Sequence, residues 1–135
     1  MDFVKLSRDV NYGNYSYGGA SSHAMSILGL FFSSDVGCTQ GSPTYAEWAF
    51  QDKWGAGFSG NAIRVEKEED EGYLYTGYIF LSDVFPDEKE PTKLKISRQQ
   101  FVDIIEEWYE KVCKYKPKEV IIKCENGQFF IETNN

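Results

Sequence analysis

Histidine is almost absent from this sequence of 135 residues, in which His23 is the single example. With one imidazole, histidine-dependent metal sites are nearly excluded, and any Cys–His nucleophile pair would depend on this residue. The three cysteines, Cys38, Cys113 and Cys124, are too few, too far apart and odd in number for a secreted disulfide framework or a zinc site. We expect free, mostly buried thiols, because a reducing cytosol disfavours the one bridge that we consider, between Cys113 and Cys124.

Long apolar runs are also missing. No run approaches the roughly 18 residues that span a bilayer, and the segment 1–5 lacks the basic and apolar regions of a secretory signal. We therefore expect a cytoplasmic location and no membrane partner. The hydrophobic fraction of 41% and the aromatic fraction of 16% exceed what a disordered chain carries. A chain of this length builds one core, so residues 1–135 are expected to form a single globular domain.

Basic residues are few in the part of the chain where acidic residues cluster. The formal net charge is −7, and residues 66–110 alone contain 13 acidic and 5 basic residues. Nucleic acids and anionic lipids need clustered lysine or arginine, so neither is an expected partner. A basic protein is the partner that this distribution favours, and the alternative is that the acidic residues maintain solubility.

The first half of the chain predicts short elements of mixed type. A helix is expected where Ala24, Ile27, Leu28 and Phe31 fall on one face, with Ser21 or Ser22 as its cap. The expected elements are a strand over 1–8, a turn-rich aromatic segment over 11–19, a helix over 20–32, a loop over 35–43 and a short helix capped by Thr44. The last segment also alternates like a strand, so both interpretations stay open for residues 44–54.

The second half predicts two hairpins and a long helix. Residues 62–67 and 73–81 are expected to pair around a polar turn at 68–72, followed by an acidic loop over Pro86–Pro91 and a strand over 93–96. Ser97 and Gln100 form a capping box, so a helix should begin at Arg98. Its core-facing stripe consists of Phe101, Ile104, Ile105, Trp108 and Val112. Strands over 119–124 and 128–133 should flank a type I′ turn at Asn126-Gly127. These elements indicate an α+β fold with a largely antiparallel sheet and two or three helices.

Acidic residues cluster at the end of the first hairpin and in the loop that follows this hairpin in the sequence. If both segments lie on one edge, nine carboxylates share a small surface that could steer a basic partner. The candidate binding residues are Glu66, Glu68, Glu69, Asp70, Glu71, Asp83, Asp87, Glu88 and Glu90. A second acidic surface is the helix ridge of Asp103, Glu106, Glu107 and Glu110, opposite the apolar stripe. No calcium-loop spacing is present, and no metal or other cofactor is expected.

Catalytic motifs are weak. A nominal nucleophile set would combine His23 with Cys38 or Ser21 and use Asp35 as the orienting residue, but nothing in the spacing of these residues supports it. Glycines 55, 57 and 60 have the spacing of a dinucleotide fingerprint, yet they precede a strand rather than a helix, which favours a bulged entry into the hairpin. We therefore do not expect an enzyme.

Tyrosine and tryptophan are frequent in the first half of the chain, at positions 12, 15, 17, 45, 48 and 54. Most of these side chains are expected in the core, and the segment 12–19 is the one that could anchor a partner at the surface.

The segment from Leu81 to Ile131 carries a pattern of helix and hairpin. It reads Ser97-x-x-x-Phe101-x-x-x-Ile105-x-x-Trp108, then Lys116-Pro117-x-x-Val120-x-Ile122 and Asn126-Gly127. This pattern resembles the C-terminal half of small bacterial immunity proteins from polymorphic toxin systems, including contact-dependent growth inhibition. The resemblance implies a non-enzymatic cytoplasmic protein that binds a cognate toxin domain, often a nuclease. The alternatives are a small-ligand-binding or enzymatic α+β domain with a pocket lined by tyrosine and tryptophan, and a structural subunit of a larger assembly.

Overall fold

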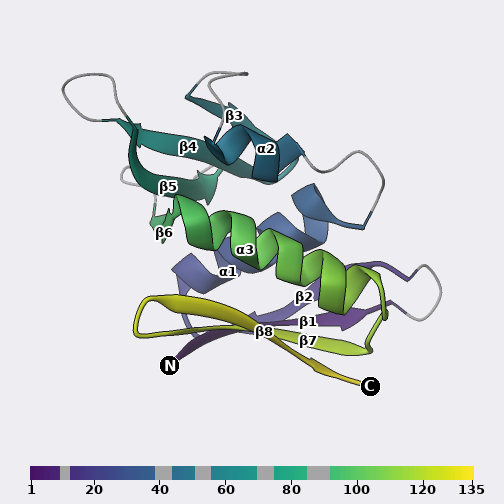
Figure 1. Ribbon diagram of the computed structural model, residues 1–135. Coiled ribbons are helices and arrows are strands. Elements are labelled where there is room, and N and C mark those ends of the chain that lie inside the picture. The colour runs from purple at the N-terminus through teal and green to yellow at the C-terminus, as the bar shows by residue number, and fades with distance from the viewer. Residues whose placement is uncertain (10–12, 39–43, 51–55, 70–74, 85–91) are drawn as a thin grey trace.

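The computed structural model describes residues 1–9, 13–38, 44–50, 56–69, 75–84 and 92–135. Two antiparallel sheets of four strands make up most of it (Figure 1). Sheet A has the order β2 (Tyr15–Ala20), β1 (Asp2–Arg8), β7 (Glu119–Glu125), β8 (Gln128–Asn134). Sheet B has the order β3 (Gly57–Ser59), β4 (Ile63–Glu69), β5 (Tyr75–Asp83), β6 (Lys93–Ser97). The predicted α+β fold is confirmed.

The helical segments are α1 (His23–Leu30), η1 (Phe31–Val36), α2 (Thr44–Phe50), α3 (Arg98–Trp108) and η2 (Tyr109–Cys113), of which η1 and η2 are π-helical turns that continue α1 and α3. Helices α1 and α3 lie between the two sheets, and α2 packs against α3. Helix α1 contacts β1 and β2 below it and β5 and β6 above it, while α3 contacts β8, β5 and β6 (Figure 1). The molecule is therefore a three-layer arrangement of sheet, helices and sheet.

The alternation of the strands decides which face of each sheet meets the helices. Sheet A buries Val4, Leu6, Val120, Ile122 and Ile131, and sheet B buries Ile63, Val65, Ile79, Leu81, Leu94 and Ile96. A helix covered by a sheet on each side needs apolar residues around most of its circumference. This explains why α1 and η1 are apolar on several sides, whereas α3 keeps one polar face.

Gly29 marks the closest approach of α1 to sheet A. A Cβ at this position would lie 2.5 Å from Val4 Cγ2 and 3.6 Å from Leu6 Cδ2. A glycine within a helix costs about 1 kcal/mol relative to alanine, and here it allows the helix backbone to pack directly on β1. The presence of a glycine inside this helix is thus explained by packing.

The helix ends match the predicted caps, with one exception. The Ser22 hydroxyl accepts a hydrogen bond from the Met25 N–H at 3.2 Å, and the Ser97 hydroxyl accepts one from the Gln100 N–H at 3.1 Å. The reciprocal bond of the capping box is not formed, since Gln100 Oε1 is buried without a hydrogen-bond partner. Helices α1 and α3 therefore each begin on a serine cap alone.

Several sequence predictions need correction or concern residues outside the described ranges. Residues 15–19, expected as turns, and residue 20, expected to begin a helix, form β2 because they pair with β1. Residues 35–36 belong to η1 rather than to a loop, and Glu68 and Glu69 extend β4 rather than forming a turn. The segment 44–50 is a helix, which resolves the open choice there. The loop over 86–91, residues 12, 54 and 55, and the side chain of Thr44 lie outside the described residues.

All strands of sheet B lie in the sequence between the first two and the last two strands of sheet A. The chain builds β1, β2, α1 and η1, then forms α2, all of sheet B, α3 and η2, and returns to add β7 and β8. Residues 39–113 are therefore an excursion that starts and ends beside sheet A.

Candidate functional site

The hairpin acids that the structure describes are already paired. Glu66 lies 3.4 Å from Arg64, and Glu68 lies 3.6 Å from Lys95, all on the face of sheet B that points away from the helices. Lys67 points the other way, where it is 4% exposed and its ammonium group lies 4.8 Å from the ring centre of Trp48. The side chain of Glu69 and residues 70, 71, 87, 88 and 90 lie outside the described part of the chain.

The two acidic segments do not start from the same edge of sheet B. Glu69 pairs with Tyr75 at one end of the β4–β5 hairpin, whereas Asp83 pairs with Ile63 at the other. Strand β5 has nine residues, so at about 3.3 Å per residue its ends are roughly 25 Å apart. Asp83 is also engaged, since its Oδ2 lies 2.9 Å from His23 Nε2. The described members of the nine-carboxylate set thus occupy separate places.

The acidic ridge of α3 is more open. Asp103, Glu106 and Glu110 are exposed, and within the described residues no basic side chain forms an ion pair with any of them. The buried stripe opposite holds the helix in place, since its five predicted residues are at most 1% exposed. Three carboxylates on a fixed helix face therefore form a continuous negative strip, which we call the α3 ridge.

Glu107 leaves the predicted ridge and turns to sheet A. Its Oε1 accepts hydrogen bonds from the Ile131 N–H at 3.1 Å and from Lys111 Nζ at 2.7 Å, and Lys111 Nζ also donates to the Ile131 carbonyl at 3.1 Å. Ile131 lies in β8, the outer strand of sheet A. The outward-facing amide of that strand needs an acceptor, and Glu107 supplies it.

An exposed aromatic ring lies at the N-terminal end of α3. Phe50, the last residue of α2, is 53% exposed, and the Arg98 guanidinium lies 4.9 Å from its ring centre. Arg98 Nε also donates to the Ala49 carbonyl at 2.7 Å, which fixes the cation at the C-terminal end of α2. Glu47 is exposed on the same short helix. The sequence did not single out this ring because nothing local indicates that α2 ends beside α3.

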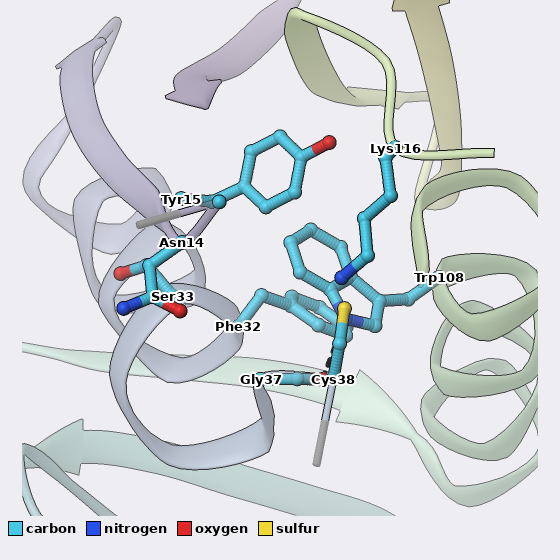
Figure 2. Close-up of a pocket in the computed structure, with 9 residues that line it drawn as sticks. Asn14, Tyr15, Phe32, Ser33, Gly37, Cys38, Trp108 and Lys116 are labelled. Atoms are coloured by element: carbon cyan, nitrogen blue, oxygen red, sulfur yellow. Dashed lines mark hydrogen bonds between the residues drawn. The ribbon is translucent and has the colours of Figure 1, made fainter. Parts of the chain in front are cut away.

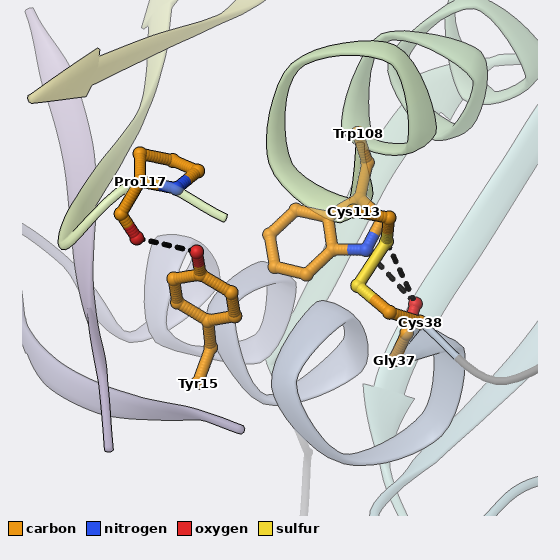
Figure 3. Close-up of a disulfide and its surroundings, with 6 residues drawn as sticks. All are labelled: Tyr15, Gly37, Cys38, Trp108, Cys113 and Pro117. Atoms are coloured by element: carbon orange, nitrogen blue, oxygen red, sulfur yellow. Dashed lines mark hydrogen bonds between the residues drawn. A yellow bond between two sulfur atoms is a disulfide. The ribbon is translucent and has the colours of Figure 1, made fainter. Parts of the chain in front are cut away.

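A disulfide joins Cys38 to Cys113, with Cα atoms 5.3 Å apart (Figure 3). The prediction of free thiols is wrong for these two residues, and Cys124 is the free cysteine. Cys38 follows η1 and Cys113 ends η2, so the bond ties the two π-helical turns together. Spacing along the sequence could not reveal this pair, because the two cysteines meet only when the α1–η1 segment packs against the α3–η2 segment.

Aromatic side chains surround the disulfide. Trp108 packs against Phe32, with ring centres 4.9 Å apart, and against Tyr15 at 5.7 Å. Its indole N–H donates to the Gly37 carbonyl at 3.0 Å, and the Tyr15 hydroxyl donates to the Pro117 carbonyl (Figure 3). The carbonyl of Gly37, the residue before Cys38, is thus held by a tryptophan from α3.

A small cavity adjoins this cluster. Its lining includes Tyr15, Phe32, Trp108 and Cys38, with Lys116 across its mouth (Figure 2). Its volume is about 40 Å³, which is room for about three water molecules. This is the tyrosine- and tryptophan-lined space that the ligand-binding alternative requires, and it is far below the several hundred Å³ of a typical ligand pocket.

The residues of the nominal nucleophile set lie apart. His23 pairs with Asp83, Cys38 is oxidised, and the Ser21 hydroxyl lies near the Phe3 backbone, where it accepts from the Phe3 N–H at 2.8 Å. The Asp35 carboxylate accepts hydrogen bonds from two backbone N–H groups at the start of β4, at 3.0 and 2.9 Å. Each of these side chains is therefore engaged in a separate structural contact.

Tyr45 and Asp35 converge over Gly60. A Cβ at Gly60 would lie 2.6 Å from Asp35 Oδ2 and 2.7 Å from the Tyr45 hydroxyl. Burial, and secondarily the Asp35 carboxylate, raise the pKa of Tyr45 to about 12. An unfolded tyrosine ionises near pH 10, so between pH 10 and 12 the unfolded chain loses a proton that the folded chain keeps. Stability should be intact below pH 10 and fall across this window.

We expect Tyr45→Phe to remove that loss. Urea unfolding of the wild type should weaken by roughly 2 kcal/mol from pH 10 to 12 more than that of the variant, because one titrating group is missing. The pKa of Tyr15 is also raised by burial, so the difference between wild type and Tyr45→Phe isolates Tyr45. Parallel stability curves for the two proteins would contradict this assignment.

Within the described residues, no group of three histidine, cysteine, aspartate or glutamate side chains is placed so that it could hold a metal ion. In that same part of the chain, no helix has the length and apolar character needed to cross a membrane.

The exposed α3 ridge, with Phe50 near its N-terminal end, is therefore the candidate functional site. The chain matches no protein-family model, and no significant similarity to a curated protein or to a solved structure was found.

Proposed function

We propose that this chain is a cytoplasmic immunity protein that binds a basic toxin domain and neutralises it through the α3 ridge. The observation that carries the proposal is that Asp103, Glu106 and Glu110 are exposed without ion-pair partners among the described residues, whereas Glu66 and Glu68 are already paired. The ridge spans the eight residues from Asp103 to Glu110, or roughly 10 Å of helix.

A nuclease is the toxin class that this surface fits best. Such an enzyme must present lysine and arginine to the phosphates of its substrate. A negative strip on a rigid helix competes for the same side chains, and long-range attraction accelerates the encounter. Phe50 is an exposed aromatic ring beside Arg98, the first residue of the same helix, and it offers an apolar contact of the kind that anchors tight interfaces.

An immunity protein is expected to be encoded directly downstream of its toxin, so the test uses the C-terminal domain of the protein encoded upstream as the toxin domain. Co-expression of wild-type protein with that domain should rescue growth, and the purified pair should bind. The ridge variant Asp103→Asn, Glu106→Gln, Glu110→Gln should associate about tenfold more slowly or worse, because steering is lost. Its fold should be unchanged, since all three side chains are exposed.

A matched control removes the same number of charges from paired acids. In Glu66→Gln, Glu68→Gln, Glu132→Gln each carboxylate has a basic partner, with Glu132 2.6 Å from Lys123. This control should associate like the wild type. Equal slowing of both variants would mean that only total charge matters, and slowing of the control alone would move the interface to the hairpin end predicted from the sequence. If the wild-type protein neither rescues growth nor binds the toxin domain, the proposed function is wrong.

A further inference from the structure

The disulfide closes the base of the 39–113 excursion. Cys38 and Cys113 are 75 residues apart in sequence, and the described residues between them include α2, sheet B and α3. The bond therefore joins the point where the chain leaves sheet A to the point where it returns. The α3 ridge lies within this closed loop, and its last member, Glu110, is in the same π-helical turn as Cys113.

Noncovalent contacts hold the same junction. Trp108 of α3 donates to the Gly37 carbonyl at the end of η1, and its ring packs on Phe32 of η1. Neither contact includes a sulfur atom, so both can persist when the bond is open. Opening the bond removes the covalent link between η1 and η2, and noncovalent contacts then connect the two turns.

Both cysteine residues are partly exposed rather than buried in the core, and we therefore expect a thiol in solution to reach the bond. In a cytoplasmic protein, a disulfide of this kind is characteristically transient and redox-sensing rather than a permanent support.

We propose that Cys38–Cys113 is a reversible redox latch that controls how firmly the α3 ridge is held for its partner. This inference rests on the proposed function. With the bond closed, η2 is fixed to η1 and the ridge is preorganised. With the bond open, the excursion stays folded but its helix opens locally more often, and the ordering needed on binding weakens the complex.

The chemical step is thiol–disulfide exchange with a dithiol. One thiolate of the reductant attacks a protein sulfur, the sulfur–sulfur bond breaks, and the other cysteine leaves as a thiolate that takes up a proton. The second thiol of the reductant then displaces the first cysteine. Two electrons and two protons pass to the protein, Cys38 and Cys113 become thiols, and the reductant becomes a disulfide.

The first measurement needs no partner. Amide hydrogen exchange is followed by mass spectrometry for oxidised protein and for protein reduced with dithiothreitol. Reduction should accelerate exchange in 98–113 at least tenfold and leave β1 and β7 protected. Cys38→Ser/Cys113→Ser should behave like the reduced wild type and ignore dithiothreitol, whereas Cys124→Ser should respond like the wild type. Re-oxidation should restore slow exchange.

Unchanged exchange in 98–113 on reduction would overturn the latch. So would complete unfolding, because the bond would then be an obligatory support with no open folded state.

The second measurement is the affinity for the upstream-encoded toxin domain in both redox states. At least tenfold weaker binding by the reduced protein supports the regulation, and equal affinity overturns it. If neither state binds while exchange in 98–113 still responds, the proposed function fails and the latch stands, so the two failures are distinguishable.

Discussion

Replacing Trp108 with alanine is expected to lower the free energy of unfolding by about 3 to 5 kcal/mol, as aromatic truncations in cores do. The side chain is fully buried and contacts Phe32 and Tyr15. Its indole also holds the Gly37 carbonyl at 3.0 Å. The substitution therefore removes packing where α3, η1 and β2 meet, and it removes a hydrogen bond there as well.

Urea unfolding followed by far-UV circular dichroism measures this loss. Trp108→Phe keeps most of the ring packing but lacks the N–H donor, so it should lose less than the alanine variant. Tyr115→Ala is a surface control, because Tyr115 is 70% exposed, and it should change stability by no more than about 0.5 kcal/mol. A Trp108→Ala protein that unfolds at the wild-type urea concentration would contradict the described burial.

The second large effect is expected from opening the disulfide. A bond that closes a loop of this length, 75 residues, restricts the unfolded chain by about 4 kcal/mol in the chain-entropy model. Cys38→Ser/Cys113→Ser should therefore be about 4 kcal/mol less stable than the oxidised wild type while keeping the same secondary structure. Equilibrium unfolding in urea without reductant measures the difference.

Two controls identify the source of that difference. Reduced wild type should unfold at the same urea concentration as the double serine variant, and Cys124→Ser should match the oxidised wild type. A double variant as stable as the oxidised protein would show that the cysteines do not constrain the unfolded chain.

Local patterns predicted the elements whose stabilising contacts are close in sequence. Helix α3 follows from a serine cap and an apolar stripe, and the β7–β8 hairpin follows from Asn126-Gly127, whose φ angles are +52° and +77°. Strand β2 was missed because its register depends on β1 and includes a bulge beside Lys5 and Leu6. The disulfide was missed for a similar reason, since its sulfurs meet only after both helices pack.

The candidate site was predicted in part. The α3 ridge was identified from helical spacing, but spacing cannot show that the amide of Ile131 draws Glu107 away from it. Arg64, the partner of Glu66, lies two residues before it on β4, so alternation along the strand places both side chains on one face. Lys95, the partner of Glu68, lies on β6, two strands away from β4, and such a neighbour is known only once the strand order and register are known.

The contacts of Glu107 and Lys111 with Ile131 bear on solubility at high concentration. The bare edge of a sheet is a template on which another chain adds a strand, and this is a common route to fibrous aggregates. Ile131 is the middle residue of the seven in β8, and both of its main-chain groups are occupied by side chains of α3 and η2. A foreign strand could pair with no more than three residues on either side. The helix that presents the acidic ridge thus also protects the β8 edge of sheet A from intermolecular strand addition.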